Sequence, residues 1–213
     1  MEIRTLVFNP ISVNTYILSD GSGDCAIIDC GCYDSYEAGE LTALLDGENL
    51  KPVLLLNTHC HLDHIFGDRL MLEKYGLGAL CHHDDLMNRK RAVDHARMFG
   101  LSMEPPPEPA GYLSGGEKVS FGNSELEVIH VPGHAPGSLA FYSKKDKSVF
   151  TGDALFEGSI GRSDLPGGNH ETLLNSIRER LFILPADTVV YPGHGNATLI
   201  GDELRFNPYF IHK

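Results

Sequence analysis

The chain has 213 residues, of which 42% are hydrophobic and 22% are charged, and its formal net charge is -12. This composition is typical of a globular protein with an apolar core, and the length predicts a single domain over residues 1–213. The acidic balance disfavours binding to nucleic-acid phosphates, and no apolar stretch reaches the roughly 18 residues that a membrane span needs. We therefore expect neither nucleic acid nor a membrane as a partner.

The N-terminus and the cysteines predict a cytoplasmic location. The opening segment MEIRTLVFNP has no basic region followed by an apolar one, as a signal peptide would have. Five cysteines are an odd number in a chain too long to be a disulfide scaffold. We expect them to be reduced thiols.

Short apolar segments bounded by turn residues predict strands in both halves of the chain. In chain order these are residues 2–8, 13–18, 25–29, 51–57, 79–81, 117–121, 125–131, 138–143, 147–152 and 187–191. Apolar residues at helical spacing, with start and stop signals, predict helices at residues 33–47, 63–76, 84–99, 171–181 and 198–206. Residues 99–116 are too rich in Pro and Gly for regular structure. The pattern favours an α/β protein in which two sheets pack face to face with helices outside.

Metal-binding side chains follow several of these predicted strands. The segment THCHLDH, residues 58–64, comes directly after the strand at 51–57. Seven candidate ligands fall just past strands, namely His59, His61, Asp63, His64, His134, Asp153 and His194. If the strand ends share one edge of the two sheets, these side chains converge there. Imidazole and carboxylate suit Zn²⁺ and similar divalent ions, and a carboxylate can bridge two ions that activate a shared hydroxide.

Two plainer interpretations compete with this one. Each residue alone could be a cap or a surface side chain, but seven together at strand ends argue against that. A closed structural zinc site is the other alternative, yet such sites are tetrahedral and often rich in cysteine, and here the ligands exceed four.

The motifs resemble those of the metallo-β-lactamase superfamily. THCHLDH is similar to the family motif T-H-x-H-x-D-H, and PGH ending at His134, TGD at Asp153 and PGH at His194 follow in the family's order. The resemblance implies a metallo-β-lactamase αβ/βα four-layer sandwich. Within the superfamily, GDALFEGSIGRSDLPGG (152–168) and FNPY (206–209) are most similar to short bacterial glyoxalase II-like (hydroxyacylglutathione hydrolase-like) proteins.

The resemblance also implies roles for the candidate ligands. His59, His61 and His134 would hold one divalent ion, Asp63, His64 and His194 a second, and Asp153 would bridge them. Zn²⁺ is the expected metal, with Fe or Mn as alternatives, and Asp63 is also expected to be catalytic. The implied reaction is thioester hydrolysis by a metal-bridging hydroxide, with S-lactoylglutathione as the model substrate. Asp29 would either orient ligands from beneath or simply end its strand.

Two departures from the glyoxalase II pattern weaken the expectation of glutathione binding. Only 19 residues follow His194, so the family's C-terminal helical domain is not expected. The family's Lys-x-Tyr appears here as Arg162-Ser163-Asp164. Arg162 could anchor an anionic substrate carboxylate, or it could form a structural ion pair with Asp164 or another acid of the loop.

Other functions and residues leave alternatives open. A persulfide dioxygenase would bind one iron through His59, His134 and Asp153, and a lactonase would use the same hydroxide. Cys60 should turn away from the ligands on either side of it, and Cys30 and Cys32 favour packing over a metal pair. We expect structural roles for His82, His83, His95, His130 and His212. His170 should cap a helix or line the pocket, and the loop PPPEP should wall the cleft or be a rigid surface connection.

Overall fold

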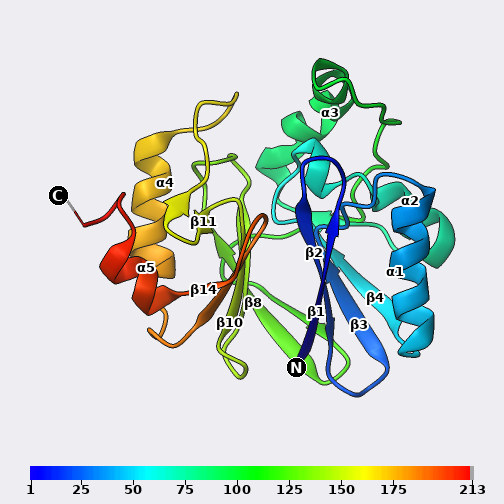
Figure 1. Ribbon diagram of the computed structural model, residues 1–213, viewed down its shortest axis with the longest axis horizontal. Helices are drawn as coiled ribbons and strands as arrows, with labels where there is room; N and C mark the ends of the chain where they lie inside the picture. Colours follow the sequence, from blue (N-terminus) through cyan, green and yellow to red (C-terminus); the bar gives the residue numbers. More distant parts are fainter. Residues whose placement is uncertain (212–213) are drawn as a thin grey trace.

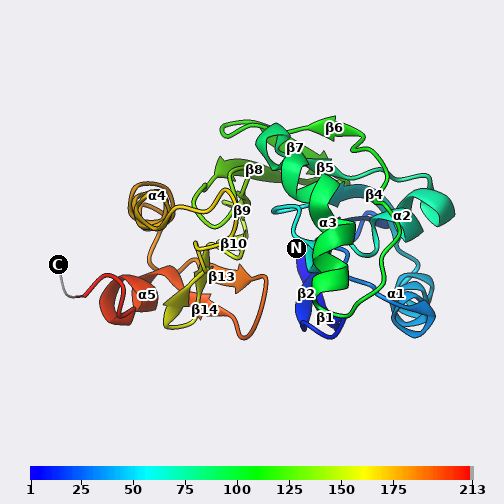
Figure 2. The same cartoon turned by 90° about the horizontal axis from the view of Figure 1, so that it is seen from above.

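The computed structural model describes residues 1–211. His212, for which we expected a structural role, lies outside the described residues. Two six-stranded sheets pack face to face, and helices cover their outer faces (Figures 1 and 2). The fold is therefore the αβ/βα sandwich that the sequence predicts. Among residues 1–211, no helix is both long and apolar enough to cross a membrane.

The first sheet contains the N-terminal half of the chain. Its strands are β1 (Glu2–Phe8), β2 (Val13–Ser19), β3 (Asp24–Ile28), β4 (Lys51–Leu56), β5 (Leu80–Cys81) and β6 (Gly111–Tyr112), in that spatial order. Helices α1 (Ser35–Gly47) and α2 (Asp68–Tyr75) lie on its outer side (Figure 1). Asp34 caps α1, because its carboxylate accepts hydrogen bonds from the backbone N–H groups of Tyr36 and Glu37.

The second sheet contains most of the C-terminal half. Its order is β14-β13-β10-β9-β8-β7. The strands are β7 (Lys118–Phe121), β8 (Ser124–His130), β9 (Leu139–Ser143), β10 (Ser148–Gly152), β13 (Val189–Pro192) and β14 (Thr198–Leu199). Helices α4 (His170–Ser176), continued by a π-helical turn (Ile177–Leu181), and α5 (Ile200–Phe206) cover its outer face (Figure 2).

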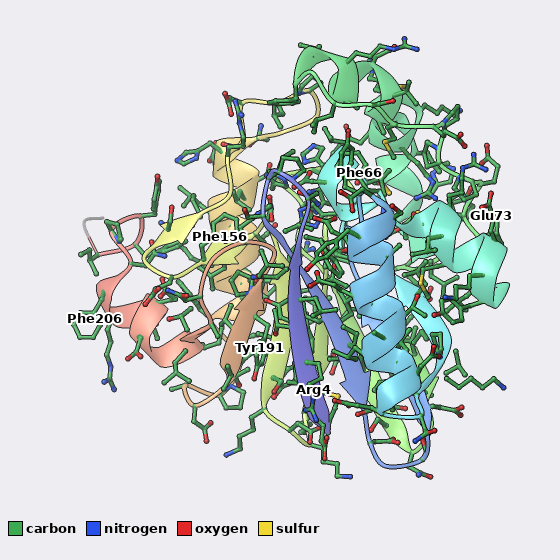
Figure 3. The ribbon with its side chains drawn as sticks, turned by 45° about the vertical axis from the view of Figure 1, so that its right-hand side comes forward. Arg4, Phe66, Glu73, Phe156, Tyr191 and Phe206 are labelled. Carbon is green, nitrogen blue, oxygen red and sulfur yellow. The ribbon has the colours of Figure 1, made fainter. Side chains whose placement is uncertain are left out.

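Alternating side chains divide the apolar residues between two kinds of core. In β2, Tyr16 and Leu18 face the second sheet, whereas Ile17 packs under the outer helices. Aromatic contacts join the two sheets in the layer between them, because the ring of Tyr16 meets Phe150 and Tyr191 edge-on, at 5.1 and 5.6 Å between ring centroids. Figure 3 shows Tyr191 on the inner side of its strand and Phe206 projecting outward from α5.

Three parallel strands of the second sheet end at one edge. β9 runs antiparallel to both β8 and β10, and β13 runs parallel to β10, so β8, β10 and β13 share one direction. The edge at which they end meets the end of β4, because the Leu139 N–H donates to the Thr58 carbonyl at 2.7 Å. Helix α3 (Leu86–Met98) lies above this edge (Figure 1). The chain therefore brings its strand ends, and the residues just past them, to one place.

The structure corrects several predicted elements. The helix expected from Asp63 instead begins at Asp68, after the 3₁₀ turn Leu62–His64. The irregular segment 99–116 contributes β6, which pairs with β5. A small hairpin of β11 (Leu155–Phe156) and β12 (Ser159–Ile160) was not predicted, and the expected helix at 198–206 begins with β14.

Candidate metal centre

His59, His61 and His134 bring three ring nitrogens together at the shared edge. Nε2 of His59 lies 3.0 Å from Nδ1 of His61, and Nε2 of His134 lies 3.1 and 2.9 Å from these two atoms. All three residues are buried. His59 and His61 follow β4 of the first sheet and His134 follows β8 of the second, so this trio joins the two sheets.

Hydrogen bonds behind the trio indicate which nitrogens carry protons. Nδ1 of His134 lies 2.7 Å from the Arg162 carbonyl oxygen, to which it must donate. Its Nε2 therefore presents a lone pair. Burial, and then the neighbouring imidazoles, hold the pKa of His59 well below its usual value, and burial and His134 lower the pKa of His61 to about 3. Converging neutral imidazoles repel one another unless a cation lies between them, so the trio fits a metal ion.

Asp63, His64 and His194 form a second group beside the first. Nε2 of His194 lies 3.1 Å from Oδ2 of Asp63, and Nε2 of His64 lies 3.5 Å from the same oxygen. Both imidazoles are oriented from behind by acceptors at Nδ1. His64 donates to Asp29 at 2.8 Å, and His194 donates to the Ser12 carbonyl at 3.0 Å.

Asp153 lies between the two groups. One of its carboxylate oxygens is 3.4 Å from Nε2 of His64, and the other is 3.6 Å from Nε2 of His134 and 3.7 Å from Nε2 of His194. Nε2 of His64 and Oδ1 of Asp153 are buried without a hydrogen-bond partner among the described residues. Such orphaned atoms facing one another are what a divalent ion would satisfy.

Carboxylates and imidazoles of opposite charge lie close together around His64 and Asp153. Burial opposes ionisation of Asp153, but the nearby His64, His134 and His194 outweigh it and lower the pKa of this carboxyl. Burial also disfavours a charged His64, yet Asp63, Asp153 and Asp29 raise its pKa well above the usual value. Without an ion, a proton on His64 balances the carboxylates, and a divalent cation would take its place.

Two glycines make the close approach of these segments possible. Gly152 has φ +50°, and a Cβ built there would lie 2.3 Å from Oγ1 of Thr58. A Cβ on Gly193 would lie 2.2 Å from Oδ1 of Asp153. Side chains at either position would separate the ligand segments, which explains glycine before Asp153 and before His194.

Asp29 and Asp85 hold the ligand segments from behind. Asp29 accepts hydrogen bonds from the N–H and hydroxyl of Thr58, at 2.7 and 2.6 Å, and from His64. Of the two roles considered for Asp29, the structure thus supports orientation of ligands. Asp85 accepts from the Cys60 N–H, between His59 and His61, and from the Gly137 N–H at 3.4 Å. No sequence pattern pointed to Asp85, because it contacts both segments only in the folded chain.

A cavity of about 360 Å³ opens in front of the seven candidate ligands, which together we call the metal-binding cluster. Its floor includes His61, Asp63, His134, Asp153 and His194. Its walls contain Ile11, Leu62, His95, Met98, Phe99, Arg162, Leu165 and Pro166. His95, expected to be structural, is therefore a cavity residue. The guanidinium of Arg162 binds both carboxylate oxygens of Asp164 at 2.8 Å, so the ion pair considered for it is present while it borders the cavity.

The thiols considered as ligands lie away from the cluster. Cys60 is fully buried among apolar residues beneath α3, as its alternation with the flanking histidines predicted. Cys30 and Cys32 are packed under the outer helices with their sulfur atoms 3.8 Å apart. No described group of three potential ligands contains a cysteine.

The remaining histidines have other contacts. His82 stacks on His130 with ring centroids 4.3 Å apart, and His83 meets the ring of Tyr112 edge-on. His170 does not cap its helix, since the cap is Asn169, whose side chain accepts from the Thr172 N–H at 2.9 Å.

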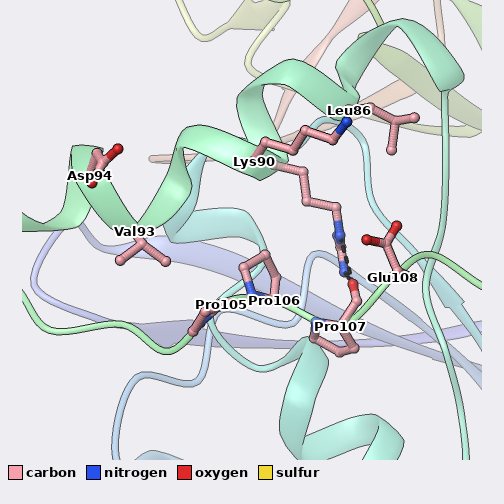
Figure 4. Close-up of a pocket in the computed structure, with 9 residues that line it drawn as sticks. Leu86, Lys90, Val93, Asp94, Pro105, Pro106, Pro107 and Glu108 are labelled. Carbon is pink, nitrogen blue, oxygen red and sulfur yellow. Dashed lines mark hydrogen bonds between the residues drawn. The ribbon is translucent and has the colours of Figure 1, made fainter.

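The proline-rich loop lies beside α3 and lines a different pocket. Pro105, Pro106 and Pro107 face Lys90 and Val93 of the helix (Figure 4). The Pro107 carbonyl accepts two hydrogen bonds from the buried Arg89 guanidinium. None of the residues that line this pocket belongs to the metal-binding cluster, so the structure favours a rigid surface connection over a wall of the metal-site cavity.

The fold is an αβ/βα sandwich, and its cluster of His and Asp side chains suits a divalent metal ion. The family model described as the metallo-beta-lactamase superfamily matches residues 8–194. The chain belongs to this superfamily.

Individual relatives are similar in sequence to this chain over nearly their whole lengths. The chain is 36% identical to a probable metallo-hydrolase of Bacillus subtilis (strain 168), covering 98% of this chain and 97% of the relative. It is 34% identical to the hydroxyacylglutathione hydrolase GloC of Haemophilus influenzae, over 100% of both chains.

Solved structures show the same fold. One, described as a di-iron-bound form, has a TM-score of 0.87 and 39% identity, with 99% of this chain and 100% of that chain covered. The BLEG-1 B3 metallo-beta-lactamase has a TM-score of 0.88 and 31% identity, with the same coverage. ETHE1 from Myxococcus xanthus has a TM-score of 0.79 and 26% identity, covering 98% of this chain and 84% of that chain.

Proposed function

We propose that the protein is a metal-dependent hydrolase that cleaves thioesters of glyoxalase II type in the cytoplasm. The observation that carries the proposal is the position of Asp153 at the floor of one cavity. One of its carboxylate oxygens lies 3.4 Å from Nε2 of His64, and the other lies 3.6 and 3.7 Å from Nε2 of His134 and of His194. Similarity to a hydroxyacylglutathione hydrolase and to a probable metallo-hydrolase supports hydrolysis as the reaction class. A substrate the size of a small thioester suits a cavity of about 360 Å³.

The donor set suggests which residues would hold each ion. His59, His61 and His134 would bind one divalent ion, and Asp63, His64 and His194 a second, with Asp153 shared. Three imidazoles favour zinc or iron at the first position, and the added carboxylates at the second suit zinc, iron or manganese. When bound, the ions would supply a nucleophile active at neutral pH and polarise the thioester carbonyl.

The chain itself would contribute orientation and exclusion of water. Asp29, the Arg162 carbonyl and the Ser12 carbonyl fix the rings of His64, His134 and His194 through their Nδ1 protons. Fixed ligand rings leave little to reorganise when substrate binds. The apolar walls displace water around the carbonyl and so strengthen electrostatic interactions there. We propose that Asp63 is the catalytic residue. Its Oδ2 lies 3.1 Å from Nε2 of His194.

Metal content and thioester hydrolysis test the proposal together. Protein produced with zinc should carry close to two ions per chain and cleave S-lactoylglutathione or a related thioester. Asp153→Asn should lose at least one ion, and Asp63→Ala should reduce hydrolysis by several orders of magnitude. Hydrolysis that persists in fully chelated protein would contradict the proposal.

A persulfide dioxygenase is the second candidate. Nε2 of His134 lies 3.1 Å from Nε2 of His59 and 3.6 Å from a carboxylate oxygen of Asp153, so these side chains could supply the two imidazoles and one carboxylate typical of non-haem iron oxygenases. With iron-loaded protein, oxygen consumption on glutathione persulfide without thioester cleavage would establish this alternative. Asp63→Ala should then have a mild effect, because Asp63 lies outside that ligand set.

A further inference from the structure

The walls of the metal-site cavity are apolar on both sides. Six apolar residues line it, namely Ile11, Leu62, Met98, Phe99, Leu165 and Pro166. They come from the β1–β2 turn, the ligand segment, the end of α3 and the loop before α4. In Figure 1 the end of α3 and the loop before α4 both rise above the shared strand edge. The apolar lining is thus assembled from four separate segments around one opening.

Part of this lining is rigid and part is exposed. Leu62 belongs to the buried cluster beneath α3, and Ile11 packs against that cluster. Met98 and Phe99, by contrast, are 81% and 62% exposed. Single exposed apolar residues are ordinary, but two that continue a buried apolar wall to the mouth of a cavity form a contiguous patch. Such a patch beside a reaction centre fits a ligand that is itself apolar.

Few polar groups compete for this space. Apart from the metal-binding side chains, Arg162 and His95 are the lining residues of the described chain that can donate a side-chain hydrogen bond. The guanidinium of Arg162 already forms an ion pair with Asp164. The wall therefore offers more matching surface to an apolar substrate arm than to a polar one.

We propose that the wall formed by Ile11, Leu62, Met98 and Phe99 binds an apolar arm of the substrate, a hydrocarbon chain or an aromatic ring, while the reacting carbonyl lies at the metal-binding cluster. This inference rests on the proposed thioester hydrolysis and specifies its substrate class. The arm can belong to the acyl group or to the thiol, because both flank the carbonyl. The cavity of about 360 Å³ has room for a medium-length chain.

The inference predicts a dependence of rate on chain length. Each methylene that leaves water should raise kcat/KM about fourfold, until the wall is covered. Two series of thioesters separate the arms. One varies the acyl group from acetyl to octanoyl on N-acetylcysteamine as the fixed thiol, and the other varies the chain length of an alkyl thiol on a fixed acetyl group.

Matched variants locate the effect. Met98→Ala and Phe99→Ala should lower kcat/KM for the longest chain by about tenfold and for the shortest chain least. Met87→Ala and Phe206→Ala are the controls, because Met87 is an exposed methionine of the same helix and Phe206 an exposed phenylalanine of α5, and neither lines the cavity. The controls should keep the full chain-length dependence.

A binding measurement separates this inference from the proposed function. Calorimetry of the zinc-loaded protein with butyrate, hexanoate, octanoate and phenylacetate measures how tightly an apolar arm binds to the wall, even if no thioester is cleaved. Hydrolysis with a flat chain-length profile in both series overturns the inference and leaves the function standing. If no thioester is hydrolysed, but the acids bind more tightly as their chains lengthen and less tightly to Met98→Ala, the proposed function is overturned and the inference stands. Equal binding of all four acids, in the absence of hydrolysis, overturns both.

Discussion

Asp85 is a buried carboxylate that fixes the distance between two ligand segments. Its oxygens accept from the Cys60 N–H, from the Gly137 N–H and from the Asn88 side chain at 2.9 Å. Burial raises the pKa of its carboxyl, and these hydrogen bonds oppose the rise. Because Cys60 lies between two histidines of one sheet and Gly137 follows His134 of the other, Asp85 is a positioning residue for the first trio.

Replacing this acceptor should weaken metal binding. Asp85→Asn sets an NH₂ group against a backbone N–H, so we expect zinc affinity to fall about 10- to 100-fold and the free energy of unfolding to fall by about 1–3 kcal/mol. Competition with a chromophoric chelator measures the first, and urea unfolding the second. Asp84→Asn is the matched control, since Asp84 is the exposed neighbour. Equal zinc affinity of the two variants would show that Asp85 has no positioning role.

Arg162 has two candidate roles, as an anchor for a substrate carboxylate and as a structural partner of Asp164. Substrates of different charge can distinguish these roles. Its Nε and Nη2 bind Asp164, and no hydrogen bond in the described chain uses Nη1. If Nη1 anchors a substrate carboxylate, Arg162→Ala should raise KM chiefly for carboxylate-bearing thioesters and leave the melting temperature nearly unchanged. Comparing one acyl group on a charged and on a neutral thiol tests this. Equal losses on both substrates, with a lower melting temperature, would assign Arg162 a structural role only.

At the residue scale, the sequence predicted those side chains whose position follows from a strand end. All seven candidate ligands lie within eight residues after the end of a strand, and parallel β8, β10 and β13 deliver His134, Asp153 and His194 to one edge. Asp85, Met98 and Phe99 come from the two ends of α3, whose placement depends on tertiary packing. No local pattern marks such residues, so sequence reasoning missed them.

At the scale of elements, long alternating strands were predicted well. Of the two-residue strands, β5 was predicted but β6, β11, β12 and β14 were not. β1 and β8 have seven residues each, enough to show their periodicity, whereas β6, β11 and β12 have two and exist only through their partners. The helix predicted from Asp63 was placed too early. Residues 62–64 form a 3₁₀ turn that is separate from α2, and the α-helix begins only at Asp68.

The stacked pair His82–His130 joins the start of α3 to the second sheet and should make stability depend on pH. Burial, and then the adjacent His130, lower the pKa of His82. Asp84 and Asp85 oppose this shift, and His83 adds to it. Nδ1 of His82 accepts from the Asp84 N–H at 3.1 Å, so protonation there also removes a cap. The unfolded chain therefore binds the proton more readily than the folded chain.

The sign of the effect follows from that difference. The contribution of His82 to the free energy of unfolding is fully present above the ordinary histidine pKa of about 6.5. It is lost as the pH falls toward the lower pKa that His82 has in the folded protein. His82→Asn keeps a cap acceptor without the titration, so its unfolding free energy should fall less between about pH 7.5 and pH 5.5 than that of the parent. The exposed neighbour supplies the control, His83→Asn. Identical pH profiles for parent and His82→Asn would contradict the assignment.

At the scale of the whole molecule, each ligand group takes residues from both sheets. The segment after β4 supplies His59 and His61 to one group and Asp63 and His64 to the other, and the second sheet completes each with His134 or His194. Direct hydrogen bonds also join the sheets at this edge, among them Tyr16 OH to the Pro192 carbonyl at 2.6 Å and the Asn14 N–H to the Gly193 carbonyl at 2.7 Å. Bound ions would thus clamp the two halves of the sandwich together.

The clamp predicts that stability depends on zinc concentration. Free zinc at about 1,000 times the dissociation constant should add about 4 kcal/mol, which for a chain of this length raises the melting temperature by roughly 10 °C. Calorimetric scans of chelated protein against a zinc series measure this, and hydrogen exchange should slow at the ends of both β4 and β13. His194→Ala removes a ligand of the second sheet and should shrink the zinc-induced shift, whereas His83→Asn should retain it. A melting temperature that is the same in zinc and in chelator would mean that the two sheets are held together at this edge by protein contacts alone.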